Sequence, residues 1–162
     1  MTKLAIVFVI AACLPAVVRA DDLTPAQDEA RIVFEEETSN ALGEMNAQCG
    51  TKAAITVDWK NFKPAAWERG IQPQALCKLV VTEIGYMCRD RPPYKKALAK
   101  QLKGVSCVFA GVQPKQKKDG TNDFTRRNMS FAKGRFTLRM HGELVNVEDN
   151  TKFTVEKTIG GE

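Results

Sequence analysis

Four cysteines carry the most visible chemistry in this sequence. Apart from Cys13 near the N-terminus, they are Cys49, Cys77, Cys88 and Cys107, separated by 28, 11 and 19 residues. Such thiols can bind zinc, exchange electrons or form disulfides. Structural zinc sites usually use ligand pairs about two to four residues apart, and a redox pair is typically C-x-x-C. Neither spacing occurs here, so the sequence predicts two structural disulfides.

The spacing of Cys77 and Cys88 restricts how the cysteines pair. Both lie in one predicted helix, in which eleven residues rise roughly 16 Å. Disulfide-bonded residues have Cα atoms less than about 7 Å apart, so these two cannot bond to each other while the helix is continuous. A third helix should return the chain towards the start of the second and bring Cys107 near Cys77. We predict Cys49–Cys88 and Cys77–Cys107, and the exchanged pairing is the open alternative.

Catalytic chemistry has little support in the sequence. His141 is the only histidine, which excludes a histidine-based triad or a site with several histidine ligands. It is expected on the outer face of the protein, and Glu83 has no second acid beside it in the core pattern. No nucleophile elbow, P-loop, zincin or EF-hand motif occurs. We expect no enzymatic activity, cofactor or metal; an enzyme of unrecognised class is the alternative.

The first twenty residues have the composition of an export signal. Lys3 precedes an apolar run of about 15 residues, and small residues around a cleavage site end at Ala20. Cleavage there would leave residues 21–162 as a single secreted or periplasmic domain with no transmembrane segment. The alternative is a lipoprotein signal, in which Cys13 carries the lipid anchor.

Charge is distributed unevenly along the chain. Residues 51–142 contain nineteen Lys and Arg against six acids, whereas residues 21–50 contain eight acids and one base. Internal pairing of these charges is one interpretation. The other is a basic surface for an anionic partner, either a protein or a component of the cell envelope. Nucleic acid is not expected, because the basic stretch lacks interleaved aromatic residues. The densest basic segment flanks a predicted turn at 119–120 and contains Lys115, Lys117, Lys118, Arg126 and Arg127.

Helical periodicity dominates the first part of the chain, residues 24–103. Thr24 and Pro25 are typical of a helix start, and the pattern predicts a helix over 25–47 that Gly50 ends. A second helix is predicted from Gln72 to Arg89, apolar around most of its circumference and therefore central. A third follows from Tyr94 to Leu102, and a strand is predicted around Ile55–Trp59.

From Val105 the apolar residues alternate with period two. This pattern predicts an antiparallel β-meander over 104–158, with a tight turn at Lys133-Gly134 and a second turn at Asp149-Asn150. A change of inward parity at Gly142 indicates a bulge or bend there. The expected fold is α+β, with the helices on one face of the meander. The predicted meander strands are 105–109, 136–140, 145–147 and 153–155.

The leading function is therefore that of an exported, non-enzymatic module, stabilised by disulfides, that acts as an envelope adaptor or an inhibitor. Its basic loop would contact the partner. The alternative is a small apolar ligand held between the sheet and the central helix. Trp59 has the inward parity of its strand. The candidate pocket is Trp59, Ile84, Phe136 and Leu138.

Overall fold

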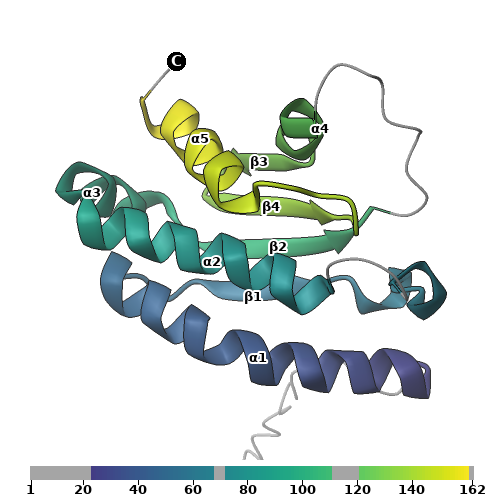
Figure 1. Ribbon diagram of the computed structural model, residues 1–162. Coiled ribbons are helices and arrows are strands. Elements are labelled where there is room, and N and C mark those ends of the chain that lie inside the picture. Colours follow the sequence, from purple (N-terminus) through teal and green to yellow (C-terminus); the bar gives the residue numbers. More distant parts are fainter. Residues whose placement is uncertain (1–22, 68–71, 111–120, 161–162) are drawn as a thin grey trace, which may run out of the picture.

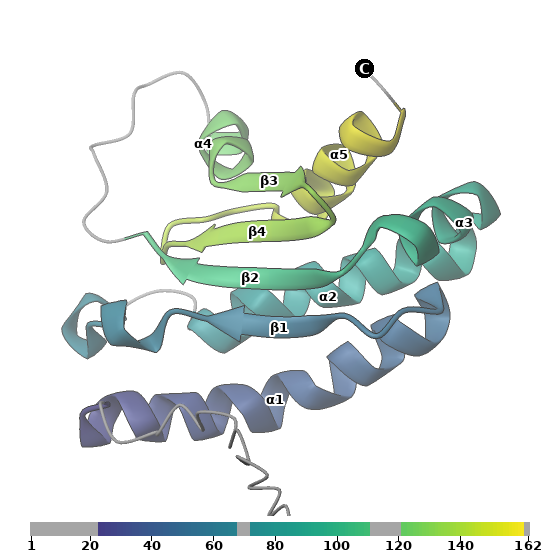
Figure 2. The same cartoon turned by 180° about the vertical axis from the view of Figure 1, so that it is seen from behind.

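The computed structural model describes residues 23–67, 72–110 and 121–160 and has an α+β fold (Figure 1). The helices are α1 (Pro25–Cys49), α2 (Pro73–Asp90), α3 (Pro92–Gln101), α4 (Thr121–Arg127) and α5 (Val147–Gly160), with the short 3₁₀ helices η1 (Trp59–Asn61) and η2 (Pro64–Trp67). The strands are β1 (Ala54–Val57), β2 (Gly104–Phe109), β3 (Met129–Ala132) and β4 (Arg135–Met140). Helices α2 and α5 cover one face of the sheet, and α1 packs against α2 (Figures 1 and 2). Among the described residues, no helix is long and apolar enough to cross a membrane.

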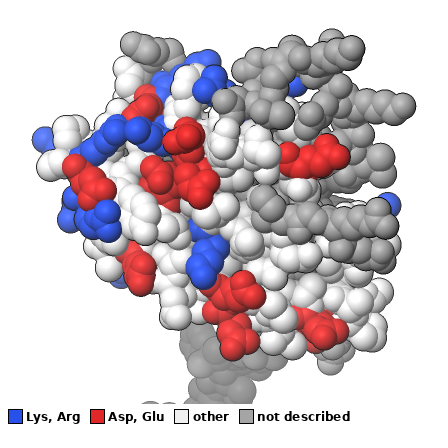
Figure 3. Space-filling model, in the orientation of Figure 1, with Lys and Arg blue, Asp and Glu red and all other residues white. Residues whose placement is uncertain are grey.

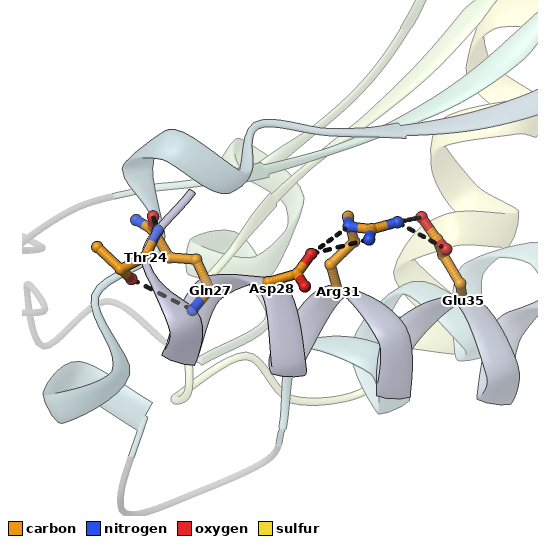
Figure 4. Close-up of polar contacts among 5 residues, drawn as sticks. All are labelled: Thr24, Gln27, Asp28, Arg31 and Glu35. Carbon is orange, nitrogen blue, oxygen red and sulfur yellow. Dashed lines mark hydrogen bonds and ion pairs between the residues drawn. The ribbon is translucent and has the colours of Figure 1, made fainter. Parts of the chain in front are cut away.

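Helix α1 begins where the sequence predicted, after Thr24. The Thr24 hydroxyl accepts a hydrogen bond from the Gln27 N–H at 3.3 Å, and the Gln27 amide oxygen accepts one from the Thr24 N–H at 3.0 Å (Figure 4). This reciprocal capping box satisfies two donors that a helix start leaves unpaired. One turn on, Arg31 pairs with Asp28 at 2.8 Å and Glu35 at 3.0 Å. The predicted first helix is confirmed, and it extends two residues further.

Helix α2 is the central helix, as predicted from its apolar circumference. Leu76, Val80 and Ile84 are fully buried. Gly85 faces α1, and a Cβ at this position would lie 3.3 Å from the Met45 Cα. The absence of a side chain therefore permits close approach of the two helices.

The sheet is mixed, so the predicted antiparallel meander is wrong. Its strand order is β1-β2-β4-β3, with β1, β2 and β4 mutually parallel. Only β3 and β4 form the expected antiparallel hairpin, closed at Lys133 and Gly134, whose φ values are 51° and 80°. Positive φ at both central residues is the type I′ pattern favoured in two-residue hairpins. Because β4 lies between β2 and β3, the basic segment joins non-adjacent strands and is not the tip of a hairpin.

Two further predicted strands are wrong. The segment 153–155 lies inside α5, and 145–147 is a loop that leads into the first residue of that helix, Val147. Val147, Thr151 and Val155 recur every four residues and are buried together. The hydroxyl of Thr151 donates to the carbonyl four residues earlier at 2.8 Å, which satisfies this buried group within the helix. The predicted turn at Asp149-Asn150 lies inside the same helix. Gly142 lies in a turn just after β4 ends at Met140, so the chain bends there and no strand bulges.

Both predicted disulfides are confirmed. Cys49 and Cys88 have Cα atoms 5.0 Å apart and join the C-terminal ends of α1 and α2. Cys77 and Cys107 have Cα atoms 6.2 Å apart and join the first half of α2 to β2. One helix is thus linked covalently to a neighbouring helix at one end and to the sheet at the other.

Candidate functional site

The residues of the predicted pocket fall into two groups. Ile84, Phe136 and Leu138 are fully buried in the hydrophobic core, where α2 faces the sheet. Trp59 is half-buried in η1 and packs edge-to-face against Phe34, with ring centroids 5.3 Å apart. Two surface grooves described below are lined by other residues.

Trp59 belongs to an aromatic cluster at the end of β1. Its ring lies 5.9 Å from that of Phe62 and 5.7 Å from that of Phe109. Trp67 closes the cluster against Phe109 at 5.9 Å and is buried. Edge-to-face and tilted contacts of this kind stabilise the packing beyond their buried area. The cluster therefore holds η1 and η2 against the sheet.

His141 lies just beyond the end of β4 and is half-buried. Its Nδ1 accepts a hydrogen bond from the Glu143 N–H at 3.1 Å, and its ring makes a T-shaped contact with that of Phe124, with centroids 5.5 Å apart. Burial lowers the pKa of this imidazole, and the nearby Glu143 carboxylate opposes the shift. No group of three or more potential metal ligands occurs within residues 23–67, 72–110 and 121–160.

Among the residues that the structure describes, Glu83 is the carboxyl group whose pKa is raised. Burial between α2 and α5 raises the pKa most, Lys152 opposes the shift, and Glu148 and Asp149 raise it further. The folded protein therefore holds this proton at a higher pH than the unfolded chain does. Stability due to the protonated form is present at low pH and is lost as pH rises through the folded pKa.

We expect Glu83→Gln to remove this loss. The free energy of unfolding of the variant minus that of the wild type should rise by up to about 1 kcal/mol from pH 4 to pH 7. The effect is small because solvent screens a half-exposed carboxylate. Urea unfolding at both pH values measures the difference. Glu36→Gln, on the exposed side of α1, is the matched control. If Glu83→Gln changed the free energy of unfolding equally at both pH values, the raised pKa assigned to Glu83 would be refuted.

A basic groove lies between α4, β3 and α5 and has a volume of about 540 Å³. We call it the α4–β3–α5 groove. Three cationic side chains line it, and no carboxylate does so among the described residues. The lining residues are Arg126 and Arg127 from α4, Met129, Ser130 and Phe131 from β3, and Phe153, Thr154, Lys157 and Thr158 from α5. The described lining is therefore basic.

Arg126 connects α4 to α5 at one side of the groove. Its Nε donates to the Asn150 side-chain oxygen at 2.9 Å, and its guanidinium carbon lies 4.2 Å from the centre of the Phe153 ring. Such a cation–π contact holds the guanidinium in place over the aromatic face. Phe153 is still 40% exposed, so an apolar residue lies directly beside fixed positive charge.

A second groove of about 520 Å³ adjoins the first. Phe153 and Lys157 line both grooves, so their side chains form the ridge between them. Tyr94 and Glu156 line the far side, and Glu156 is paired with Arg91. The second groove therefore has mixed charge, in contrast to the first.

The helical face of the protein carries charges of both signs among its described residues. Positive and negative side chains are interspersed over it in Figure 3. The pairs of Arg31 with Asp28 and Glu35, and of Arg91 with Glu156, are examples of this internal pairing. The described lining of the α4–β3–α5 groove differs in having cations and no carboxylate.

The predicted basic patch is only partly placed by the structure. Arg126 and Arg127 lie in the groove, whereas Lys115, Lys117 and Lys118 lie outside the described residues. The sequence interpretation missed Phe153 and Lys157 because it assigned their segment to strands. The recurrence of apolar and threonine residues every four positions from Val147 was the signal that could have found this helix.

No protein-family model, curated protein or solved structure matches this chain. The groove itself is therefore the feature that bears on function: three cations and an exposed aromatic residue line it at the edge of the sheet.

Proposed function

We propose that the protein is an exported, non-enzymatic binding module that holds an acidic partner protein in the α4–β3–α5 groove. The observation that carries this proposal is the combination of three cations, no lining carboxylate among the described residues and the exposure of Phe153, which is 40% accessible. Charge complementarity favours encounter with an acidic surface and disfavours basic ones. The exposed ring adds apolar area that an approaching side chain can cover.

The disulfides support the export component of the proposal. Bonds such as Cys49–Cys88 and Cys77–Cys107 form and persist mainly in oxidising compartments outside the cytosol. The apolar leader over residues 1–20 gives a route to such a compartment, with cleavage after Ala20 or lipid attachment at Cys13. Residues 21–162 would then act as one secreted or periplasmic domain.

A small apolar ligand has less support as the partner. Ile84, Phe136 and Leu138 are fully buried and pack within the hydrophobic core. The α4–β3–α5 groove is open and charged, which suits a macromolecular segment better than an apolar small molecule.

Selection of random twelve-residue peptides displayed on phage tests the acidic preference. We expect the enriched peptides to carry a net negative charge and aliphatic residues. Lys157→Glu should weaken binding of a synthesised enriched peptide at least about tenfold at 0.15 M salt, because it places a like charge beside the ligand. Anisotropy titration measures this loss.

Lys52→Glu is the matched control, since Lys52 is exposed just before β1, at the opposite edge of the sheet. The proposal fails if enriched peptides are not acidic, or if the two lysine variants bind an enriched peptide equally well.

A further inference from the structure

We propose that the partner segment binds the α4–β3–α5 groove in extended form, as a fifth strand added to the free edge of β3. This inference rests on the proposed function and specifies its binding mode. β3 is an edge strand, paired with β4 on one side alone among the described residues. Strand addition uses main-chain hydrogen bonds for affinity and alternate side chains for specificity.

The register of the hairpin identifies which main-chain groups point to the free edge. The Arg139 N–H donates to the Asn128 carbonyl at 2.8 Å, so these two residues form a hydrogen-bonded pair. In an antiparallel ladder such pairs alternate with non-bonded ones. Ser130 therefore bonds to β4, whereas the N–H and C=O groups of Met129 and Phe131 point away from it.

Only one of these four edge groups has a partner within the described part of the chain. The Phe131 carbonyl accepts a hydrogen bond from the Thr158 hydroxyl at 3.4 Å, which is at the weak limit of such bonds. An added strand could therefore bond to the N–H groups of Met129 and Phe131 and to the Met129 carbonyl. It could also replace the Thr158 hydroxyl as the donor to the Phe131 carbonyl.

Helix α5 provides a cover for an added strand. In both views it crosses β3, and its C-terminal half projects past that strand on the side away from β4 (Figures 1 and 2). Its groove-facing residues are Phe153, Thr154, Lys157 and Thr158. A strand lies about 4.8 Å from its neighbour, so a fifth strand beside β3 would lie within the groove. Every second side chain would then face Phe153.

Charge distinguishes a partner segment from a second copy of this chain. Pairing two β3 edges would bring two sets of Arg126, Arg127 and Lys157 into the same groove. Like charges brought together at an interface disfavour the complex. An acidic segment makes the opposite contribution, because its carboxylates would lie near these cations.

The test uses the full-length processed protein and the capped peptide (Val-Glu)₄. Two matched variants carry four N-methyl groups each, on all valines or on all glutamates. Successive N–H groups of a strand point to opposite edges, so each variant blocks one edge only. We expect the parent peptide to bind, one methylated variant to lose at least about tenfold in affinity and the other to retain binding.

Amide hydrogen exchange gives a second measurement. Peptide binding should slow exchange at Met129 and Phe131 and leave Ser130, which already faces β4, unchanged. Equal affinity of both methylated peptides, whether retained or lost, would overturn strand addition. Strand addition would also be overturned if the parent peptide did not bind while phage-selected acidic peptides did. The same holds if light scattering showed a dimer in which the same two amides were protected. Strand addition can therefore fail while the protein still binds acidic peptides in a manner sensitive to Lys157→Glu. If the protein does not bind acidic peptides in that manner, the proposed function itself is refuted.

Discussion

Replacing Cys77 and Cys107 together by alanine is expected to lower the free energy of unfolding by about 4 kcal/mol. This bond closes a loop with a sequence separation of 30, so its loss frees a large part of the unfolded chain. Both sulfur atoms are fully buried, and their removal also leaves a small cavity between α2 and β2. The midpoint of thermal unfolding should fall by roughly 10–15 °C.

Urea unfolding followed by circular dichroism at pH 7 measures this effect. Reduction of the wild-type protein should produce at least as large a loss, because it opens the Cys49–Cys88 bond as well. Replacing Cys49 and Cys88 by alanine is the matched comparison, with a sequence separation of 39 and an expected loss of similar size. The structural role assigned to these bonds would be wrong if the reduced and oxidised proteins unfolded at the same urea concentration.

The disulfide pairing was predictable because a local pattern set a long-range constraint. Once the segment around Cys77 and Cys88 was identified as one helix, its rise per residue excluded a bond between them. The start of α1 was equally local, since Thr24 and Gln27 form their capping box within a single turn. In these cases the information needed lies within a few residues of the feature.

The second half of the chain was not predictable in this way. In α5, Val147, Thr151 and Val155 are β-branched, and short stretches of such residues resemble strands. Tertiary packing overrides that preference by burying all three against the core. Strand order has no local signal at all: nothing near Val105 specifies that it pairs with both Ile55 and Phe136 in parallel.

The groove illustrates the same limit for a site. Arg126 and Arg127 were identified from charge density alone, but Phe153 and Lys157 lie 26 or more residues further along the chain. They meet the two arginines only because α5 crosses β3. A site assembled by packing between a helix and a sheet edge is visible in the fold and not in the spacing of its residues.

Gly134→Ala is expected to lower the free energy of unfolding by about 3 kcal/mol. With φ at 80°, this residue lies in the left-handed region, which costs a residue with a side chain roughly 1–2 kcal/mol. An added Cβ would also lie 2.4 Å from the main-chain oxygen of Gln101, which has no flexible end to move aside. The turn would have to shift, and with it the hydrogen bond from the Lys103 N–H to the Gly134 carbonyl at 2.7 Å. That bond contributes about 1 kcal/mol.

Gly50 provides the control that separates backbone strain from collision. It has φ at 69° but no atom within 4 Å of an added Cβ, so Gly50→Ala should cost only about 1 kcal/mol. Asparagine tolerates the left-handed region, so Gly50→Asn should be nearly neutral while Gly134→Asn remains destabilised by more than about 2 kcal/mol. Urea unfolding of the four variants gives the comparison. The contact of Gly134 with Gln101 and Lys103 anchors the closed end of the β3–β4 hairpin. If substitutions at the two glycines lowered the free energy of unfolding equally, this contact would not contribute to stability.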